Sequence, residues 1–189
     1  MNLPNKLTLI RIFMIPLFVA TFYVTALPYN FIISAGIFAL AALTDFLDGY
    51  IARKYNLVTD MGKFLDPIAD KVLVSTALIV ILVPPFGVQM LPWYASILTA
   101  TILARELVIS GFRLVAAGKG LVIAADKSGK IKTFITDLAL IFIIVCGQIT
   151  PYQFDLTNWI GTGLLAISAL LTLYSGIECI VKNKDVLKG

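Results

Sequence analysis

Four long stretches without a single charged side chain set the first limit on what this chain can fold into. The stretches are residues 12–44, 72–104, 138–150 and 156–177. A helix needs about 20 apolar residues to cross the hydrocarbon core of a bilayer. Prolines interrupt the two longest stretches, so each of these is predicted to form a hairpin of two helices.

Six transmembrane helices follow from this pattern. We expect them at residues 5–27, 30–54, 63–83, 91–117, 131–149 and 156–181. Hydrophobic residues make up 59% of the chain and charged residues only 14%, whereas about a quarter of the residues of a soluble domain are charged. The sequence has no internal repeat and no linker long enough to divide it. It therefore predicts an all-α integral membrane protein with a single domain, residues 1–189.

Lysines and arginines are distributed unevenly among the predicted loops. Apart from Arg105, they lie near the start of the first span, around the second loop, around the fourth loop and after the sixth span: Lys6, Arg11, Arg53, Lys54, Lys63, Lys71, Arg113, Lys119, Lys127, Lys130, Lys132, Lys182, Lys184 and Lys188. Because basic residues accumulate in cytoplasmic loops, both termini are predicted to face the cytoplasm. We expect a multi-pass protein of the cell membrane whose basic loops meet membrane lipids, and we expect no nucleic-acid partner.

Four aspartates surround the predicted turn between the second and third spans. Asp45 and Asp48 are three residues apart and Asp66 and Asp70 are four apart, so each pair would lie on one face of a helix. A charged side chain costs about 2.5–3.5 kcal/mol at mid-bilayer depth and less near the interface, and neighbouring carboxylates repel one another. Such a cluster needs cations, protons or basic partners to neutralise it.

The available donor atoms indicate which cation would suit this cluster. The chain has no histidine, and neither of its two cysteines lies near the aspartates in the sequence. Oxygen donors alone favour hard cations, so we expect Mg²⁺ or Mn²⁺ in preference to zinc or copper. Two divalent ions would balance four carboxylates, and a pair of metals about 4 Å apart suits displacement at phosphorus.

Simpler explanations exist for each residue taken alone. Asp66 precedes Pro67 and could be a helix N-cap with proline at the first helical position. Asp45 and Asp48 could be interfacial residues paired with the basic residues of the turn. The combination of four aspartates at these spacings around a basic turn favours a functional site, since ionisable residues within membranes are usually functional.

The segment from Asp45 to Asp70 reads Asp-x-x-Asp-Gly-x-x-Ala-Arg, then eight residues, then Gly-x-x-x-Asp-x-x-x-Asp. It resembles the signature of the CDP-alcohol phosphatidyltransferases at every specified position. The resemblance implies the six-helix fold of that family, with Asp45, Asp48, Asp66 and Asp70 around two metal ions. It also implies that Asp70 is the base that deprotonates the acceptor hydroxyl.

The resemblance further assigns residues to the donor substrate, CDP-diacylglycerol. Gly49 would allow the cytidine nucleotide to approach the backbone closely, and Arg53 and Thr59 would help to hold it. The candidate donor-binding residues are Asn5, Thr8, Gly49, Ala52, Arg53, Thr59 and Gly62.

Outside the signature, the chain resembles the branch of the family that uses glycerol 3-phosphate as the acceptor, the phosphatidylglycerophosphate synthases. The supporting residues are Asn2-Leu3-Pro4-Asn5-x-Leu7-Thr8-x-x-Arg11, Leu65-Asp66-Pro67-Ile68-Ala69-Asp70-Lys71, Arg105-Glu106, Arg113 and Gly129-Lys130-x-Lys132-Thr133. A dianionic phosphate needs basic partners, and the candidates are Arg105, Arg113, Lys130 and Lys132. As alternatives, Arg105 could pair with Glu106 or with an aspartate, and the two lysines could only set the topology.

The expected reaction transfers the phosphatidyl group of CDP-diacylglycerol to glycerol 3-phosphate, giving phosphatidylglycerol phosphate and CMP. Two alternatives remain at this point. An enzyme of the same family could use another acceptor, such as inositol phosphate or serine, and a divalent-cation transporter could line its pathway with the aspartates. The resemblance also suggests a homodimer.

Overall fold

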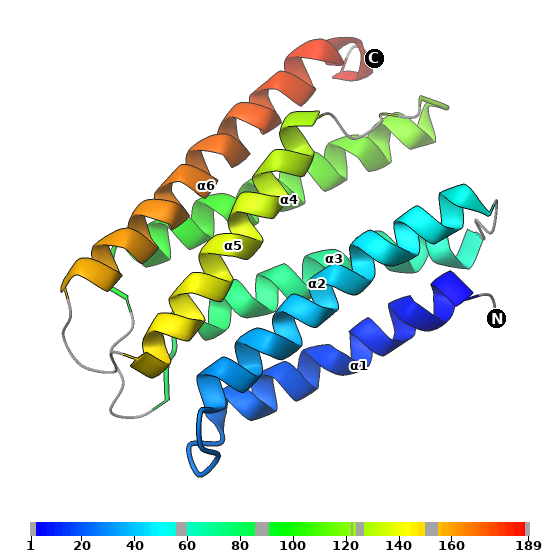
Figure 1. Ribbon diagram of the computed structural model, residues 1–189. Coiled ribbons are helices and arrows are strands. Elements are labelled where there is room, and N and C mark those ends of the chain that lie inside the picture. The colour runs from blue at the N-terminus through cyan, green and yellow to red at the C-terminus, as the bar shows by residue number, and fades with distance from the viewer. Residues whose placement is uncertain are drawn as a thin grey trace. The chain divides into compact units, whose positions relative to one another are not determined.

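The computed structural model describes residues 3–55, 60–85, 91–121, 123, 127–149 and 155–187. These ranges contain six long helices followed by one short 3-10 helix (Figure 1). The helices are α1 (Leu3–Tyr23), α2 (Asn30–Lys54), α3 (Asp60–Val80), α4 (Ala95–Gly118), α5 (Lys127–Ile149), α6 (Asp155–Lys182) and η1 (Lys184–Leu187). No strand occurs within the described ranges, and the predicted all-α class is confirmed.

Five of these helices are long and apolar enough to cross a membrane. The apolar segments are Asn5–Tyr23, Asn30–Gly49, Ala95–Gly118, Gly129–Gln148 and Trp159–Lys182. Helix α3, which corresponds to the predicted span 63–83, is not among them. Its first half carries charged residues, including Asp66, Asp70 and Lys71, and only its last nine residues are free of charge. The chain is a multi-pass membrane protein.

Several helix boundaries differ from the predicted ones for local reasons. Helix α1 ends at Tyr23, and the turn that follows includes Tyr29 with a φ angle of 57°. Helix α4 begins at Ala95, because the chain first makes a turn in which the Ala95 N–H donates to the Pro92 carbonyl oxygen over 3.0 Å. Helix α3 begins at Asp60, so Pro67 lies inside it, and the interpretation of Asp66 as an N-cap is wrong.

The described residues form two compact units. The first comprises Met1–Met90 and Leu140–Thr157, and the second comprises Leu91–Ala139 and Asn158–Gly189. Because α1, α2 and α3 all belong to the first unit, the signature aspartates do so as well. The basic residues of the predicted acceptor site belong to the second unit.

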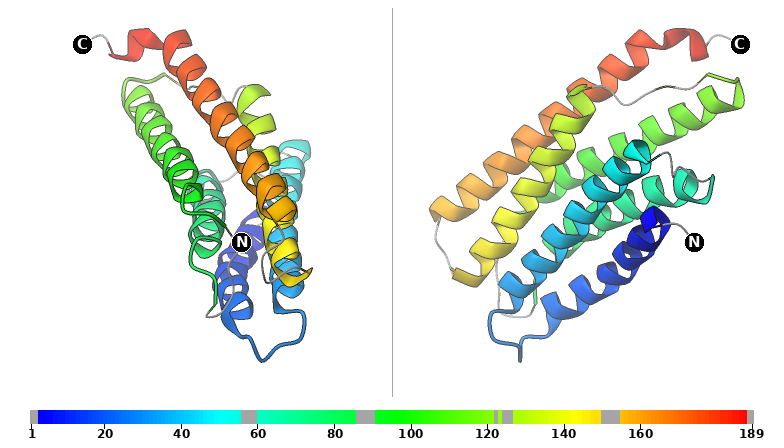
Figure 2. Two further views of the ribbon diagram at one scale, coloured as in Figure 1. Left: turned by 90° about the vertical axis from the view of Figure 1, so that its left-hand side faces the viewer. Right: turned by 45° about the vertical axis from the view of Figure 1, so that its right-hand side comes forward.

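In the first unit, α1 and α2 run antiparallel and pack along their length (Figures 1 and 2), and both contact α3. Their interface is filled by Phe18, Phe22, Phe31 and Phe38, whose ring centroids lie 4.8–6.3 Å from their neighbours. Aromatic rings packed in tilted pairs at these separations contribute a large buried apolar area. At the far end from the signature aspartates, Asn30 donates to the Phe22 carbonyl oxygen and Ser34 to the Thr21 hydroxyl, so hydrogen bonds also join α1 and α2 there.

In the second unit, polar contacts tie α4, α5 and α6 together. The hydroxyls of Thr136 on α5 and Ser168 on α6 are 2.6 Å apart and buried. At the end of α4, the Lys119 Nζ donates to the carbonyl oxygen of Val186 in η1 over 2.8 Å. A small apolar cluster of Ile109, Phe112, Ala116, Cys179 and Val186 lies beside this contact. These contacts fix η1 against the end of α4.

Candidate active site

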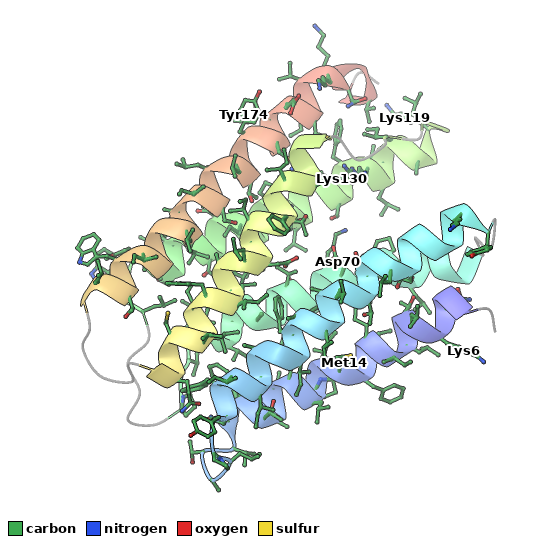
Figure 3. All side chains as sticks on the ribbon, viewed as in Figure 1. Lys6, Met14, Asp70, Lys119, Lys130 and Tyr174 are labelled. Carbon is green, nitrogen blue, oxygen red and sulfur yellow. The ribbon has the colours of Figure 1, made fainter. Side chains whose placement is uncertain are left out.

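The buried face of α1 begins with polar residues and continues with apolar ones. Its buried positions are Asn5, Thr8, Arg11, Ile15, Phe18 and Phe22, and their spacing of three and four residues places them in one row along a helix. The first half of this row lies beside the signature aspartates. Lys6, labelled in Figure 3, is exposed at the start of the same helix.

Arg11 makes ion pairs with two of the four aspartates. Its Nη1 donates to Asp45 Oδ1 over 2.6 Å, and its Nη2 donates to Asp48 Oδ2 over 2.5 Å. The Nε is 3.4 Å from the hydroxyl of Thr44. The side chains of Arg11 and Asp48 are 0% and 2% exposed, whereas that of Asp45 is 41% exposed. A guanidinium can bridge two carboxylates in this way because its donors form a rigid, planar fork, which the ammonium group of lysine lacks.

Asp66 on α3 also contacts the buried face of α1. The Thr8 hydroxyl donates to Asp66 Oδ1 over 2.5 Å, which connects the polar face of α1 to α3. Asp45 and Asp48 are bound by the same guanidinium, so their carboxylates lie close enough to repel each other. Asp70, labelled in Figure 3, follows Asp66 by one turn on α3 and is half-buried.

Two of the four signature aspartates, Asp45 and Asp48, thus share one arginine, and Asp66 is hydrogen-bonded to Thr8 on α1.

Among the candidate donor-binding residues on α2 and α3, Gly62 is buried and Gly49 is half-buried. Thr59 lies outside the described residues, as do the side chains of Ala52 and Arg53. Among the side chains that the structure describes, no group of three or more Asp, Glu, His or Cys residues converges as a set of metal ligands.

In the second unit, Arg105 is held by both a neighbour on α4 and a residue on α6. Its Nη2 donates to the Ser175 hydroxyl over 2.5 Å, and its Nη1 lies 3.3 Å from Glu106 Oε1. The guanidinium rests on Gly176, where a Cβ atom would lie only 2.8 Å from Nε. That Nε is buried and has no hydrogen-bond partner among the described residues.

Glu106 also pairs with Lys132 on α5, whose side chain is buried. Arg105 thus pairs with Glu106, which is one of the alternatives that the sequence left open for it, and the same carboxylate neutralises a second basic residue. Burial distinguishes Lys132 from a lysine that only sets topology, since such a lysine would remain in water. Arg113 is half-buried, and its Nε lacks a hydrogen-bond partner within the described part of the chain. Lys130, labelled in Figure 3, is exposed.

A family model, CDP-alcohol phosphatidyltransferase, matches residues 1–174. The chain belongs to the CDP-alcohol phosphatidyltransferase family. A protein of Bacillus subtilis (strain 168) named CDP-diacylglycerol–glycerol-3-phosphate 3-phosphatidyltransferase is 38% identical to it, over 99% of this chain and 97% of the relative. Proteins of the same name from Rickettsia bellii and Salmonella typhimurium are 40% and 36% identical, over 93% and 94% of this chain and 91% and 92% of theirs.

Membership of the CDP-alcohol phosphatidyltransferases makes the chain an enzyme and excludes the alternative of a cation transporter. It also implies dependence on a divalent metal ion, and the side chains at the signature fit such an ion by their chemistry. All the donors there are oxygens, which hard divalent cations prefer. A carboxylate has about four lone-pair sites, so pairing with an arginine does not exhaust its capacity to bind a cation.

The sequence places Arg11 among the basic residues that set topology and in the opening motif shared with the branch that uses glycerol 3-phosphate, but it predicts no pairing with the aspartates. The structure shows that pairing. The spacing Asn5-x-x-Thr8-x-x-Arg11 contained the necessary signal, because it places the arginine on the same helix face as two candidate donor-binding residues. No comparable signal marked Ser175 and Gly176. Their contact with Arg105 depends on how α4 packs against α6.

Proposed function

We infer that this protein transfers the phosphatidyl group from CDP-diacylglycerol to sn-glycerol 3-phosphate, forming phosphatidylglycerol phosphate and CMP. One observation carries the inference: relatives with that activity in their names match at 36–40% identity over nearly the whole chain. The match extends well beyond the aspartate signature into the helices that carry the basic candidates for the acceptor site.

We propose that Asp45, Asp48, Asp66 and Asp70 hold two divalent ions, Mg²⁺ or Mn²⁺. When bound, the ions would polarise the phosphoryl oxygens and stabilise the charge that develops on the leaving CMP. The burial of Asp48 and its proximity to Asp45 and Asp66 support this assignment. Carboxylates crowded in this way need more positive charge than one arginine provides.

The donor nucleotide is assigned to the polar end of α1 and to the signature segment of α2 and α3. Asn5 and Thr8 are buried on the face of α1 that meets the aspartates, which supports their role beside the donor. The other donor-binding candidates are Gly49, Ala52, Arg53, Thr59 and Gly62. The two glycines would admit the nucleotide close to the backbone, and Arg53 would pair with its phosphate.

Asp70 is proposed as the general base. It takes the proton from the 1-hydroxyl of glycerol 3-phosphate while the oxygen of that hydroxyl forms a bond to the phosphorus that bears the diacylglycerol. The bond between that phosphorus and the CMP oxygen breaks, and CMP leaves with the electron pair. The half-buried position of Asp70, one turn beyond Asp66, is compatible with contact with both a metal ion and a substrate.

The phosphate of the acceptor is assigned to Arg105, Arg113, Lys130 and Lys132. The Arg105 and Arg113 Nε groups are buried without a hydrogen-bond partner among the described residues, which supports a role in binding an anion. Burial raises the cost of leaving such a donor unpaired. Lys132 shares Glu106 with Arg105, so both side chains are pre-positioned on one carboxylate.

The proposed membrane arrangement has six spans, with α3 as the third, and both termini in the cytoplasm. The active site would then face the cytoplasm in the cell membrane, where soluble glycerol 3-phosphate is available. The distribution of Lys and Arg supports this orientation. We treat residues 1–189 as one family domain, supported by the family match over residues 1–174, and propose a homodimer.

Release of CMP by the purified protein tests the proposed reaction. The protein in detergent, given CDP-diacylglycerol and Mg²⁺ or Mn²⁺, should release CMP only when glycerol 3-phosphate is added. Asp45→Asn serves as the matched control, because it removes one negative charge from the signature without changing the size of the side chain. Absence of CMP release from well-folded protein with both substrates present would refute the proposal.

A further inference from the structure

We propose that Arg11 is a positioning residue for the metal-binding carboxylates. It would fix Asp45 and Asp48 relative to each other so that both can hold a divalent ion. This inference rests on the proposed function, which assigns metal binding to the two aspartates. It goes beyond that function because neither the signature nor the acceptor-site candidates include Arg11.

Arg11 bridges the two carboxylates through separate nitrogen atoms. The two Nη atoms of Arg11 donate to one oxygen of Asp45 and one oxygen of Asp48, over 2.6 and 2.5 Å. The guanidinium is planar and rigid, so one hydrogen bond from each Nη atom holds the two carboxylates at a fixed separation. The interaction engages one oxygen of each carboxylate, and a carboxylate can accept from arginine and bind a cation at the same time.

The location of Arg11 in α1 also supports a positioning role. It lies about two turns into α1 and is 0% exposed, whereas Lys6 on the same helix is exposed. A basic residue that only sets membrane orientation would be expected in water, as Lys6 is. Arg11 instead lies beside the buried Asp48, so its charge acts inside the protein.

The charges around Arg11 also support this role. Asp45 and Asp48 are bound by the same guanidinium, so their two negative charges lie close together and repel each other. Without Arg11, the repulsion would push the carboxylates of Asp45 and Asp48 apart in the metal-free protein. A metal ion would then have to bring them together again, and part of its binding free energy would be lost. Groups that orient metal ligands in this way affect metal affinity by about 10- to 100-fold.

The test is the affinity of the purified full-length protein for Mn²⁺ without substrates, measured from the electron paramagnetic resonance signal of the free ion. Arg11→Gln should weaken Mn²⁺ binding by about 10- to 100-fold. Arg11→Lys should also weaken it, because a single ammonium group keeps the charge but cannot bridge both carboxylates. Lys6→Gln removes a positive charge from the exposed side of α1 and should bind Mn²⁺ as the unmodified protein does.

The outcomes separate this inference from the proposed function. If Asp48→Asn leaves Mn²⁺ binding unchanged, the metal assignment itself is wrong. If Asp48→Asn abolishes binding while folded Arg11→Gln binds Mn²⁺ as tightly as the unmodified protein, or more tightly, the positioning role alone is refuted. Should Arg11→Gln fail to fold, Arg11→Lys decides, and unmodified Mn²⁺ affinity in Arg11→Lys would contradict the proposal.

Discussion

The guanidinium of Arg11 on α1 and the carboxylate of Asp48 on α2 lie 2.5 Å apart, and both side chains are almost completely shielded from solvent. The same arginine also pairs with Asp45, whose side chain is 41% exposed. One arginine therefore serves two carboxylates in different environments. This difference has consequences for stability that can be measured separately from catalysis.

Replacing Asp48 by Asn should destabilise the metal-free protein more than replacing Asp45 by Asn. Removing one partner of a buried ion pair is costly when the remaining charge is left without full neutralisation. In Asp48→Asn the buried Arg11 keeps only Asp45, whose side chain is 41% exposed, whereas in Asp45→Asn it keeps the buried Asp48. The free energies of unfolding of the two variants in detergent with a chelator would measure the difference. Equal losses would show that burial does not control the strength of the two ion pairs.

Asp70→Asn should abolish turnover while leaving the binding of CDP-diacylglycerol nearly intact. A general base acts mainly in the transition state, and its removal lowers the rate by about 10²- to 10⁴-fold. Asp45→Asn, in contrast, should weaken metal binding as well as turnover. Equilibrium binding of the nucleotide lipid, measured beside the rate of CMP release, distinguishes the two cases. A rate like that of the unmodified protein for Asp70→Asn at saturating Mg²⁺ would rule out Asp70 as the base.

Gly176→Ala should raise the Michaelis constant for glycerol 3-phosphate by about tenfold, since the loss of one charge-assisted hydrogen bond contributes at least about 1.5 kcal/mol. The added Cβ would lie 2.8 Å from Arg105 Nε and 3.1 Å from its Cγ, so the arginine must move. Gly163→Ala is the matched control on the same helix, where a Cβ meets nothing within 4 Å. The constant for CDP-diacylglycerol should not change in either variant. Equal constants for glycerol 3-phosphate in the two variants would contradict a role for Arg105 at the acceptor phosphate.

The predicted orientation can be tested by labelling single cysteines in intact cells with an impermeant thiol reagent. In a background of Cys146→Ala and Cys179→Ala, Tyr29→Cys should react from outside, because the turn after α1 lacks Lys and Arg. Lys54→Cys, at the end of α2, should react only after permeabilisation. Both positions are exposed in the structure, so accessibility to the reagent depends on the side of the membrane. The reverse labelling pattern would invert the proposed topology.

Much of the fold could be predicted from the sequence because a helix that crosses a membrane must be long and apolar. Apolar length and charge predicted the helices, and all six appear close to the expected positions. The ends of the helices were less predictable where a turn occupies part of an apolar stretch, as before Ala95. Helix α3 is the hardest helix to assign as a span, since the aspartates that we propose as metal ligands also shorten its apolar part.

The candidate site was predictable only in part. Four aspartates at helical spacings pointed to one cluster, and the structure brings Asp66 to α1 through Thr8. The ion pairs of Arg11 were not predicted, because a basic residue near the start of a span is usually explained by topology. The contact of Arg105 with Ser175 joins residues 70 positions apart and depends on tertiary packing, which local spacing cannot reveal.

The central claim, transfer of the phosphatidyl group to glycerol 3-phosphate, is tested most directly by an acceptor panel. Purified protein would receive radiolabelled CDP-diacylglycerol with glycerol 3-phosphate, inositol phosphate or serine, and the lipid products would be separated and counted. We predict phosphatidylglycerol phosphate as the main labelled product, formed only with glycerol 3-phosphate and only with Mg²⁺ or Mn²⁺ present. Faster formation of labelled lipid with inositol phosphate or serine would contradict the claim.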